Sequence, residues 1–182
     1  MKIQSPYHLV IDLNLQQLSL YFSDDCYWKN GDIRWNNNLS LKPIFTTLIS
    51  SAKNGIGQLN NSFKTPLGRH IIRAKIGGEA PINSVFVGRR LTGEIWNSSL
   101  EKLHANRDWI LTRILWLSGL EKGFNRLGNV DTMKRYIYIH GSPPNVKMGK
   151  VGSKGCVRMK SHEIVKLFDI VPVLTTVNLK YL

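Results

Sequence analysis

Short segments in which every second residue is apolar recur along the chain, and this pattern constrains the fold more than any other feature of the sequence. Between His8 and Phe22 the apolar residues alternate on both sides of a polar stretch, Asn14 to Gln17, which predicts a β-hairpin. A period of two places the apolar side chains of each strand on one face. Further strands are predicted from Ile44 to Ser50, Arg69 to Ile76, Ser84 to Val87, Trp109 to Leu117, Tyr136 to Ile139 and Val171 to Leu179.

Two segments favour helices. Ser98 to Asn106 is a candidate helix with a serine cap, and Ser161 can cap a second helix that runs through Phe168. Many short strands with one or two short helices predict a mainly β protein, an antiparallel β-sandwich or barrel. The residues of the second helix expected to face the core are Ile164, Val165 and Phe168.

The length of 182 residues suits one domain with its own hydrophobic core. No internal repeat, low-complexity tract or linker divides the sequence, so we expect a single domain over residues 1–182. The stretch 24–42 is polar and rich in asparagine, which predicts a surface loop or an insertion.

The chain is strongly basic, with a formal net charge of +13 at pH 7. Such a charge favours an anionic partner, for example nucleic acid, a membrane surface or an acidic small substrate. The basic residues are spread out and form no run of five, so we do not expect a nucleic-acid partner. Charge alone does not choose among the other partners, and the sequence leaves the oligomeric state open.

No stretch approaches the 18 or more apolar residues of a membrane span, so we expect no stable membrane insertion. Residues Met1 to Pro6 carry neither the apolar core nor the cleavage site of a secretory signal. If Met1 is the natural start, the sequence predicts a cytosolic protein. A periplasmic protein is the alternative if a leader was removed.

Two cysteines, Cys26 and Cys156, do not make a disulfide framework, so we expect two free thiols. Cys156 lies in a polar, glycine-flanked turn and is the candidate nucleophile, although free cysteines are more often buried and inert. A basic surrounding is expected to favour its thiolate. Around Cys156, between His140 and Lys166, a single acid, Glu163, faces Lys147, Lys150, Lys154, Arg158, Lys160 and Lys166.

His140 is the candidate general base, because it follows a predicted strand and precedes Cys156 by 16 residues. A lone histidine is more often a satisfied core residue, and only its combination with Cys156 favours catalysis. An imidazole needs a partner on its second nitrogen to fix its tautomer, and a backbone carbonyl or Ser142 is a candidate. Gly141, which begins the loop back to Cys156, is a candidate substrate contact.

The turn around Cys156 offers further candidates. Gly155 leaves room for a substrate backbone, and its N–H group with that of Cys156 is a candidate oxyanion hole. Arg158 and Lys154 are candidates to bind a substrate carboxylate, with Ser153 beside them; a solvated basic face is the competing interpretation.

The sequence predicts no metal site and no cofactor. A zinc site from Cys156, His140 and His162 is conceivable, but the usual paired ligand spacing is absent. The glycines near Cys156 match neither a P-loop nor a dinucleotide-binding fingerprint.

At these residues the chain resembles the YkuD-type L,D-transpeptidases. Their signature is His-Gly-Thr/Ser, a loop, and then Ser/Thr-His-Gly-Cys-hydrophobic-Arg/Asn; here the two parts are His140 to Ser142 and Ser153 to Met159. The segment Thr65 to Gly68 matches the Thr-Pro-x-Gly turn of these domains, and the resemblance covers nearly the whole chain. Lys154 stands where many members carry a second histidine.

The resemblance implies a YkuD-type β fold and a cysteine acyl-enzyme that needs no metal or cofactor. Cys156 would attack the amide between the third residue of a peptidoglycan stem tetrapeptide, often diaminopimelate, and D-Ala, which His140 would protonate as it leaves. Water as acceptor gives an L,D-carboxypeptidase, which we expect in cytosolic murein recycling. The alternatives are a periplasmic L,D-transpeptidase that forms 3-3 cross-links or attaches proteins, and a non-catalytic basic binding module. Sensitivity to carbapenems is a further implication.

Overall fold

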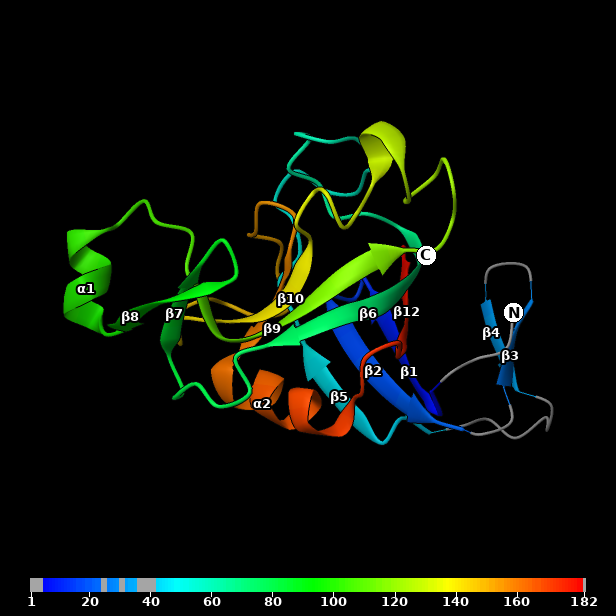
Figure 1. Cartoon of the computed structure of the whole chain (residues 1–182), viewed down its shortest axis with the longest axis horizontal. Helices are drawn as coiled ribbons and strands as arrows, with labels where there is room; N and C mark the ends of the chain where they lie inside the picture. The colour runs from blue at the N-terminus through cyan, green and yellow to red at the C-terminus, as the bar shows by residue number, and fades with distance from the viewer. Residues whose placement is uncertain (1–4, 24–25, 30–31, 36–41, 182) are drawn as a thin grey trace.

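The computed structural model describes residues 5–23, 26–29, 32–35 and 42–181, and most of its strands belong to one curved sheet (Figure 1). The strands follow the order β11-β10-β9-β6-β12-β1-β2-β5. This sheet is built from β1 (Tyr7–Asp12), β2 (Gln17–Phe22), β5 (Phe45–Leu48), β6 (Gly68–Ile76), β9 (Ile110–Gly119), β10 (Tyr138–Ser142), β11 (Val157–Lys160) and β12 (Thr176–Lys180), with the hairpin β7 (Ser84–Val87) and β8 (Arg90–Ile95) attached to β9.

The two edges of the sheet meet, which makes it a nearly closed barrel. Ser50, just after β5, and Arg158 of β11 exchange both backbone hydrogen bonds, at 3.0 and 2.9 Å. The predicted β-rich class with one or two short helices is confirmed. Most pairs are antiparallel, but β1 pairs with β12, and β10 with β11, in parallel.

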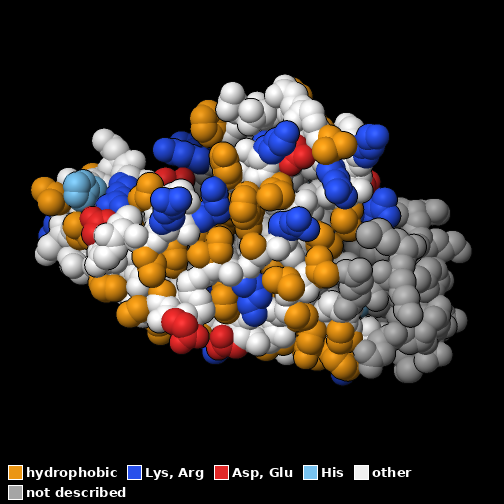
Figure 2. All heavy atoms as spheres, in the orientation of Figure 1, with side chains coloured by type: hydrophobic (Ala, Val, Ile, Leu, Met, Phe, Trp, Pro, Cys, Tyr) orange, Lys and Arg blue, Asp and Glu red, His pale blue; other side chains and the backbone are white. Residues whose placement is uncertain are grey.

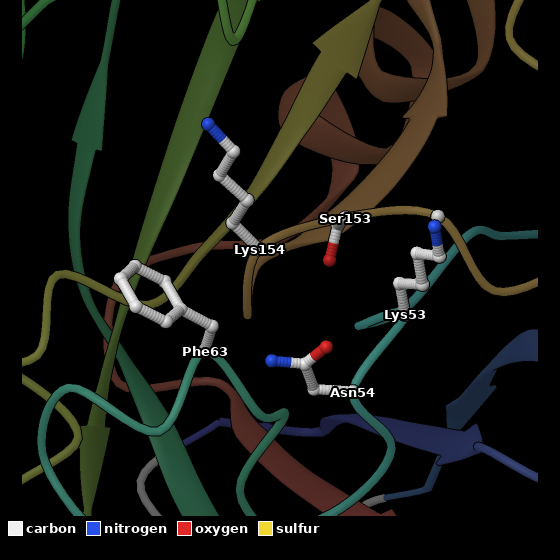
Figure 3. Close-up of a pocket in the computed structure, with 6 residues that line it drawn as sticks. Lys53, Asn54, Phe63, Ser153 and Lys154 are labelled. Atoms are coloured by element: carbon white, nitrogen blue, oxygen red, sulfur yellow. The ribbon is translucent and has the colours of Figure 1, made fainter.

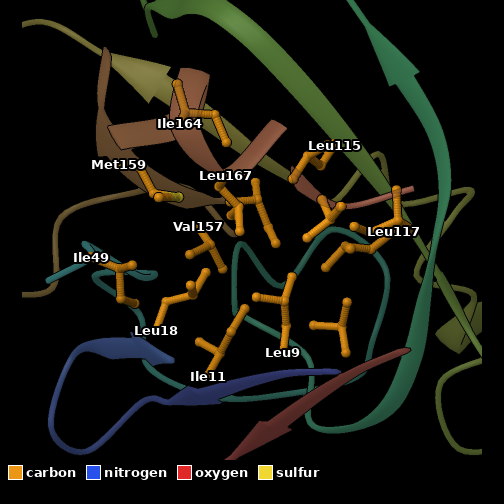
Figure 4. Packing of buried hydrophobic residues seen from close by; sticks show 14 of the residues in the cluster. Leu9, Ile11, Leu18, Ile49, Leu115, Leu117, Val157, Met159, Ile164 and Leu167 are labelled. Atoms are coloured by element: carbon orange, nitrogen blue, oxygen red, sulfur yellow. The ribbon is translucent and has the colours of Figure 1, made fainter. Parts of the chain in front are cut away.

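The barrel interior holds the main core, which the alternating pattern predicts (Figure 4). Leu9 and Ile11 of β1 and Leu18 and Leu20 of β2 are fully buried, as the hairpin prediction requires. Phe22 instead is exposed at the end of β2.

Among the described residues the helices are α1 (Ser98–Leu103) and α2 (Ser161–Ile170), together with a 3-10 turn at Gly128–Val130. Helix α2 packs against β9, β10 and β11. Its buried residues are Ile164, Leu167 and Phe168; Val165 is only half-buried, because spacings of three and four define the inner side of a helix.

The predicted serine caps are wrong. Asn97 caps α1 by accepting a hydrogen bond from the amide of Leu100, so the cap lies one residue earlier and the helix ends before Asn106. Lys160 precedes α2 without a side-chain cap, and the Ser161 hydroxyl lies 3.4 Å from the carbonyl of Ser142 and can donate to it. None of the helices among the described residues is long and apolar enough to cross a membrane.

Several strands lie where the sequence predicted none. β8 and β11 are absent from the prediction, and the segment predicted as a polar loop contains β3 (Cys26–Lys29) paired with β4 (Asp32–Trp35). These segments are four to six residues long, so pairing partners rather than local pattern decide their conformation. The remainder of 24–41, including the side chain of Cys26, lies outside the described residues, so its predicted free thiol stays a prediction.

Among the described residues, the basic side chains on one face of the protein do not form a single dense patch (Figure 2). Figure 2 shows Lys and Arg side chains spread singly over the face in view, among apolar and neutral side chains.

Candidate active site

The parallel pair β10 and β11 brings the two parts of the motif together. Ile139 pairs with Val157 and His140 with Arg158, so Cys156, one residue before β11, lies beside Tyr138. Ile139 and Val157 point into the barrel core, whereas Tyr138 and Cys156 belong to a cluster on the outer face. His140, two residues after Tyr138, shares this outer face. The sequence predicted that His140 follows the end of a strand. In the structure β10 extends through Ser142, so His140 lies within the strand.

The thiol of Cys156 lies between two backbone groups. The amide of Tyr138 donates to Sγ at 3.3 Å, and the thiol donates to the carbonyl of Tyr136 at 3.4 Å. Tyr136 has a positive φ of 57°, a conformation that turns the chain just before β10. Cys156 is a free cysteine.

The resting thiol is neutral. Although the residue as a whole is half-buried, burial around Sγ raises the pKa of Cys156 to about 12. The Tyr138 amide and the charges of Arg158 and Arg135 lower this pKa, and Asp108 raises it. The predicted thiolate-favouring surroundings are therefore wrong for the resting state, because desolvation outweighs the nearby cations.

His140 is neutral as well and has a defined tautomer. It is buried, and burial lowers its pKa to about 4. Its Nδ1 lies 2.8 Å from the carbonyl of Gly141; a carbonyl only accepts, so Nδ1 carries the proton and Nε2 has the free lone pair. The sequence named a backbone carbonyl or Ser142 as the partner that fixes the tautomer of His140, and in the structure this partner is the backbone carbonyl of Gly141. Ser142 donates instead to the carbonyl of Met159 at 2.9 Å and ties β10 to β11.

Gly141 is required for packing. A Cβ at this position would lie 2.6 Å from the carbonyl oxygen of Leu111 and 3.0 Å from Cβ of Thr112. The register of β10 against β9 shifts between His140 and Gly141, and the close approach of the strands is possible only without a side chain. The structure buries Gly141 among these atoms rather than opening it to a substrate.

The turn before Cys156 is held by its own polar groups. The buried Ser153 hydroxyl donates to the carbonyl of Cys156 at 2.5 Å and accepts from the amide of Gly155 at 3.1 Å. The Gly155 amide is thus directed at Ser153, which disagrees with its predicted place in an oxyanion hole. Gly155 has φ +132° and packs against Ile137, so its lack of a side chain serves the turn and not a substrate backbone.

Thr65 of the Thr-Pro-x-Gly turn supports the same loop. Its buried hydroxyl donates to the carbonyl of Gly155 at 2.9 Å and accepts from the amide of Ala52 at 3.0 Å. The two sequence motifs, 90 residues apart, are therefore parts of one hydrogen-bonded structure.

Arg158 is not a free cation. Its guanidinium lies 2.6 Å from the carboxylate of Asp108 and donates to the carbonyl of Gly152 at 3.1 Å. Asp108 raises and Arg158 lowers the pKa of both His140 and Cys156, so this ion pair lies near both groups. A substrate carboxylate would have to displace Asp108 to pair with Arg158.

Sequence reasoning missed a cationic and aromatic wall next to the thiol. Arg89, in the turn between β7 and β8, donates to the Tyr138 hydroxyl at 3.0 Å. Its guanidinium lies 4.5 Å from the centre of the Trp116 ring and 4.8 Å from that of Tyr136. Burial raises the pKa of the Tyr138 phenol. The aromatic residues of the predicted strands were a signal, but nothing local indicated Arg89 or Asp108.

Lys154 is exposed and borders a cavity of about 370 Å³ together with Lys53 and Phe63 (Figure 3). His162 is exposed on α2 and pairs with Glu163 at 3.0 Å. Among the described residues no three His, Cys, Asp or Glu side chains lie close enough to hold a metal ion.

Comparison with known proteins gives a family match over most of the chain. A model of the L,D-transpeptidase catalytic domain, YkuD, matches residues 6–179. The search of curated proteins found no match to this chain.

Solved structures with the same fold are distant in sequence. L,D-transpeptidase 3 from Mycobacterium tuberculosis has a TM-score of 0.53 at 10% identity, over 96% of this chain and 61% of that chain. The same protein in complex with a faropenem-derived adduct has a TM-score of 0.51 at 10% identity, over 96% and 60%. Bd1075 from Bdellovibrio bacteriovorus has a TM-score of 0.50 at 17% identity, over 96% and 47%. The chain thus spans about half to three fifths of the length of these proteins.

Proposed function

The chain belongs to the L,D-transpeptidase (YkuD) catalytic-domain family, and on that premise we propose that it is an enzyme that acts on peptidoglycan stem peptides through an acyl-enzyme on Cys156. The single observation that carries the proposal is the pairing of β10 with β11, which brings Cys156, one residue before β11, against Tyr138, two residues along β10 from His140. A thiol held by backbone groups, with a neutral imidazole that presents an unprotonated Nε2 on the neighbouring strand, is suited to nucleophilic catalysis.

Acylation begins from two neutral groups. Because a buried thiolate is unfavourable, the Sγ proton passes to Nε2 of His140 as Sγ attacks the carbonyl carbon between diaminopimelate and D-Ala. The C–N bond then breaks, and the imidazolium returns the proton to the amine of D-Ala. The Nδ1–H bond to the Gly141 carbonyl keeps the ring oriented and favours its transient positive charge.

Deacylation uses the same base. In the version we propose, His140 takes a proton from water as its oxygen attacks the thioester carbonyl. The C–S bond then breaks, the imidazolium returns the proton to sulfur, and the thiol is restored with a tripeptide as product. This reaction is an L,D-carboxypeptidase reaction, and the role that we propose for it is murein recycling in the cytosol. An amine acceptor in the periplasm would instead give 3-3 cross-links or protein attachment, and the product separates the two.

The test is intact-protein mass spectrometry of the wild type and of Cys156→Ala after incubation with a tetrapeptide and, separately, with a carbapenem. We expect a covalent carbapenem adduct on the wild type only, and release of D-Ala from the peptide with tripeptide as product. A cross-linked dimer with little tripeptide would contradict the carboxypeptidase. A folded wild-type protein that forms no adduct and shows no turnover would contradict the proposal that the protein is an enzyme, and would favour a basic binding module.

A further inference from the structure

Two adjoining cavities border the loop that carries Cys156. The first, of about 370 Å³, is lined by Lys53, Asn54, Phe63, Gly152, Ser153 and Lys154. The second, of about 280 Å³, has Lys134, Arg135 and Tyr136 among its lining residues. Phe63 and Lys154 line both cavities, so we treat the two as one continuous groove, called the basic groove below.

The charges of the basic groove all have one sign. Its charged lining residues are Lys53, Lys134, Arg135 and Lys154, and no Asp or Glu lines either cavity. Within the described part of the chain, no carboxylate lies within 4.0 Å of the ammonium groups of Lys53 or Lys154. A cleft lined by one sign of charge concentrates ligands of the opposite sign.

The first cavity also offers apolar and polar contacts. Figure 3 shows Lys53 on one side and Phe63 and Lys154 on the other, with Ser153 and Asn54 between them. Phe63 is 55% exposed and has a positive φ of 55°. Because the Phe63 ring is exposed and lines the cavity, it is accessible to a ligand bound there. An aliphatic chain can pack on its ring while a carboxylate meets the lysines.

The basic groove lies within reach of the thiol. Lys154 is two residues before Cys156, which limits their Cα separation to about 7 Å. Tyr136, which lines the second cavity, accepts the hydrogen bond of the thiol through its carbonyl at 3.4 Å. An extended peptide advances about 3.3–3.6 Å per residue, so a carboxylate one or two residues from the acylated carbon reaches the groove.

Resting on the proposed function, we propose that the basic groove binds a carboxylate of the acyl donor on the N-terminal side of the bond that is cleaved, with Lys53 and Lys154 as the residues that recognise it. The sequence predicted carboxylate binding by Lys154 and Arg158. Because Asp108 already pairs with Arg158, the structure assigns this role to Lys154 with Lys53 instead. The groove thus selects acidic stem peptides over neutral ones.

This carboxylate preference is tested with two tetrapeptides that differ only in the second residue, which is linked to the third through its side chain. In one peptide the α-carboxylate of the second residue is free, and in the other it is a carboxamide. Turnover is measured for the wild type, Lys53→Gln, Lys154→Gln and the double variant. Lys122→Gln is the matched control, since it removes one charge from an exposed lysine outside the groove. For the acidic peptide only, the double variant is expected to lose about tenfold in kcat/KM, mainly through a higher KM. A loss of this size is expected because a hydrogen bond to a charged group is removed. Equal losses for both peptides, or no loss, would overturn the proposal.

Failure of the groove and failure of the enzyme are distinguishable. If the wild type forms no carbapenem adduct and releases no D-Ala, the proposed function is wrong, and equilibrium binding of both peptides to Cys156→Ala then decides about the groove. Tighter binding of the acidic peptide that the double substitution abolishes supports the groove; equal affinities overturn it. If inorganic phosphate displaces the peptide at lower concentrations than acetate does, the groove is a phosphate site. This result would also overturn the proposal that it binds a carboxylate.

Discussion

The backbone amide of Tyr138 donates to Sγ of Cys156 at 3.3 Å. Tyr138 lies two residues before His140 on the same strand, β10. One strand, β10, therefore positions both the proposed nucleophile and the proposed base. The hydrogen bond also favours negative charge on sulfur, against the effect of burial on the pKa of the thiol. The relative placement of the two groups depends on the pairing of β10 with β11 and on the hydrogen bonds of Ser153 and Thr65 that hold the turn before Cys156.

The reactivity of Cys156 is expected to rise steeply only at alkaline pH. Burial raises its pKa to about 12, so at pH 7–8 little thiolate exists, and the alkylation rate should increase about tenfold per pH unit above that range. Iodoacetamide alkylation followed by peptide mapping separates Cys156 from Cys26. A rate that has already reached its plateau at pH 7 would instead indicate a preformed thiolate–imidazolium pair.

Acid is expected to destabilise the fold between pH 6.5 and about 4. Burial lowers the pKa of His70 and His140 to about 4, so below 6.5 the unfolded chain binds protons that the native state does not. Each histidine then costs up to about 1.4 kcal/mol of unfolding free energy per pH unit. The lowered pKa of Asp131 acts only below its usual 3.8, outside this window.

Urea unfolding at pH 7.5, 6 and 5 measures this dependence. His70→Gln should reduce the slope of the unfolding free energy with pH, even if it lowers stability at pH 7.5, because it removes one of the buried imidazoles. A free energy of unfolding that stays constant from pH 7.5 to 5 would contradict the prediction.

Arg89 is expected to position the wall beside the thiol. Arg89→Ala removes the hydrogen bond to Tyr138 and the contacts with the Trp116 and Tyr136 rings, contacts worth about 1 kcal/mol. The rate of carbapenem acylation should fall severalfold to about tenfold. Arg90→Ala is the control, an exposed arginine of the same hairpin. Equal effects of the two substitutions would mean that only the net charge matters.

Thr65 is expected to stabilise the loop of Cys156 from a distance. Thr65→Val keeps the shape but removes the hydroxyl that joins Ala52 and Gly155, leaving a buried donor and a buried acceptor unpaired. The loss should be about 2–4 kcal/mol of unfolding free energy, with slower acylation. Thr65→Ser retains the hydroxyl, so it should keep most of the stability and most of the acylation rate. Stability and acylation of Thr65→Val equal to the wild type would refute this role.

Much of the fold could be predicted because alternation of apolar residues depends on local sequence alone. The hairpin of β1 and β2 and the bounds of β7 agree with the structure. β11 could not be predicted: its four residues follow a glycine turn and become a strand by pairing with β10 and, at Arg158, with Ser50. The same pairing closes the barrel, which no local pattern encodes.

For the site, the sequence by itself indicated the proposed reactive groups, Cys156 and His140, because the two parts of their motif are separated by only a short loop. Only the tertiary structure decided what surrounds them. Asp108 lies 50 residues from its partner Arg158, and Arg89 lies 49 residues from its partner Tyr138, so these contacts exist only in the folded chain. The structure also decided the protonation states, since the charges counted along the sequence are outweighed by desolvation, which depends on three-dimensional burial.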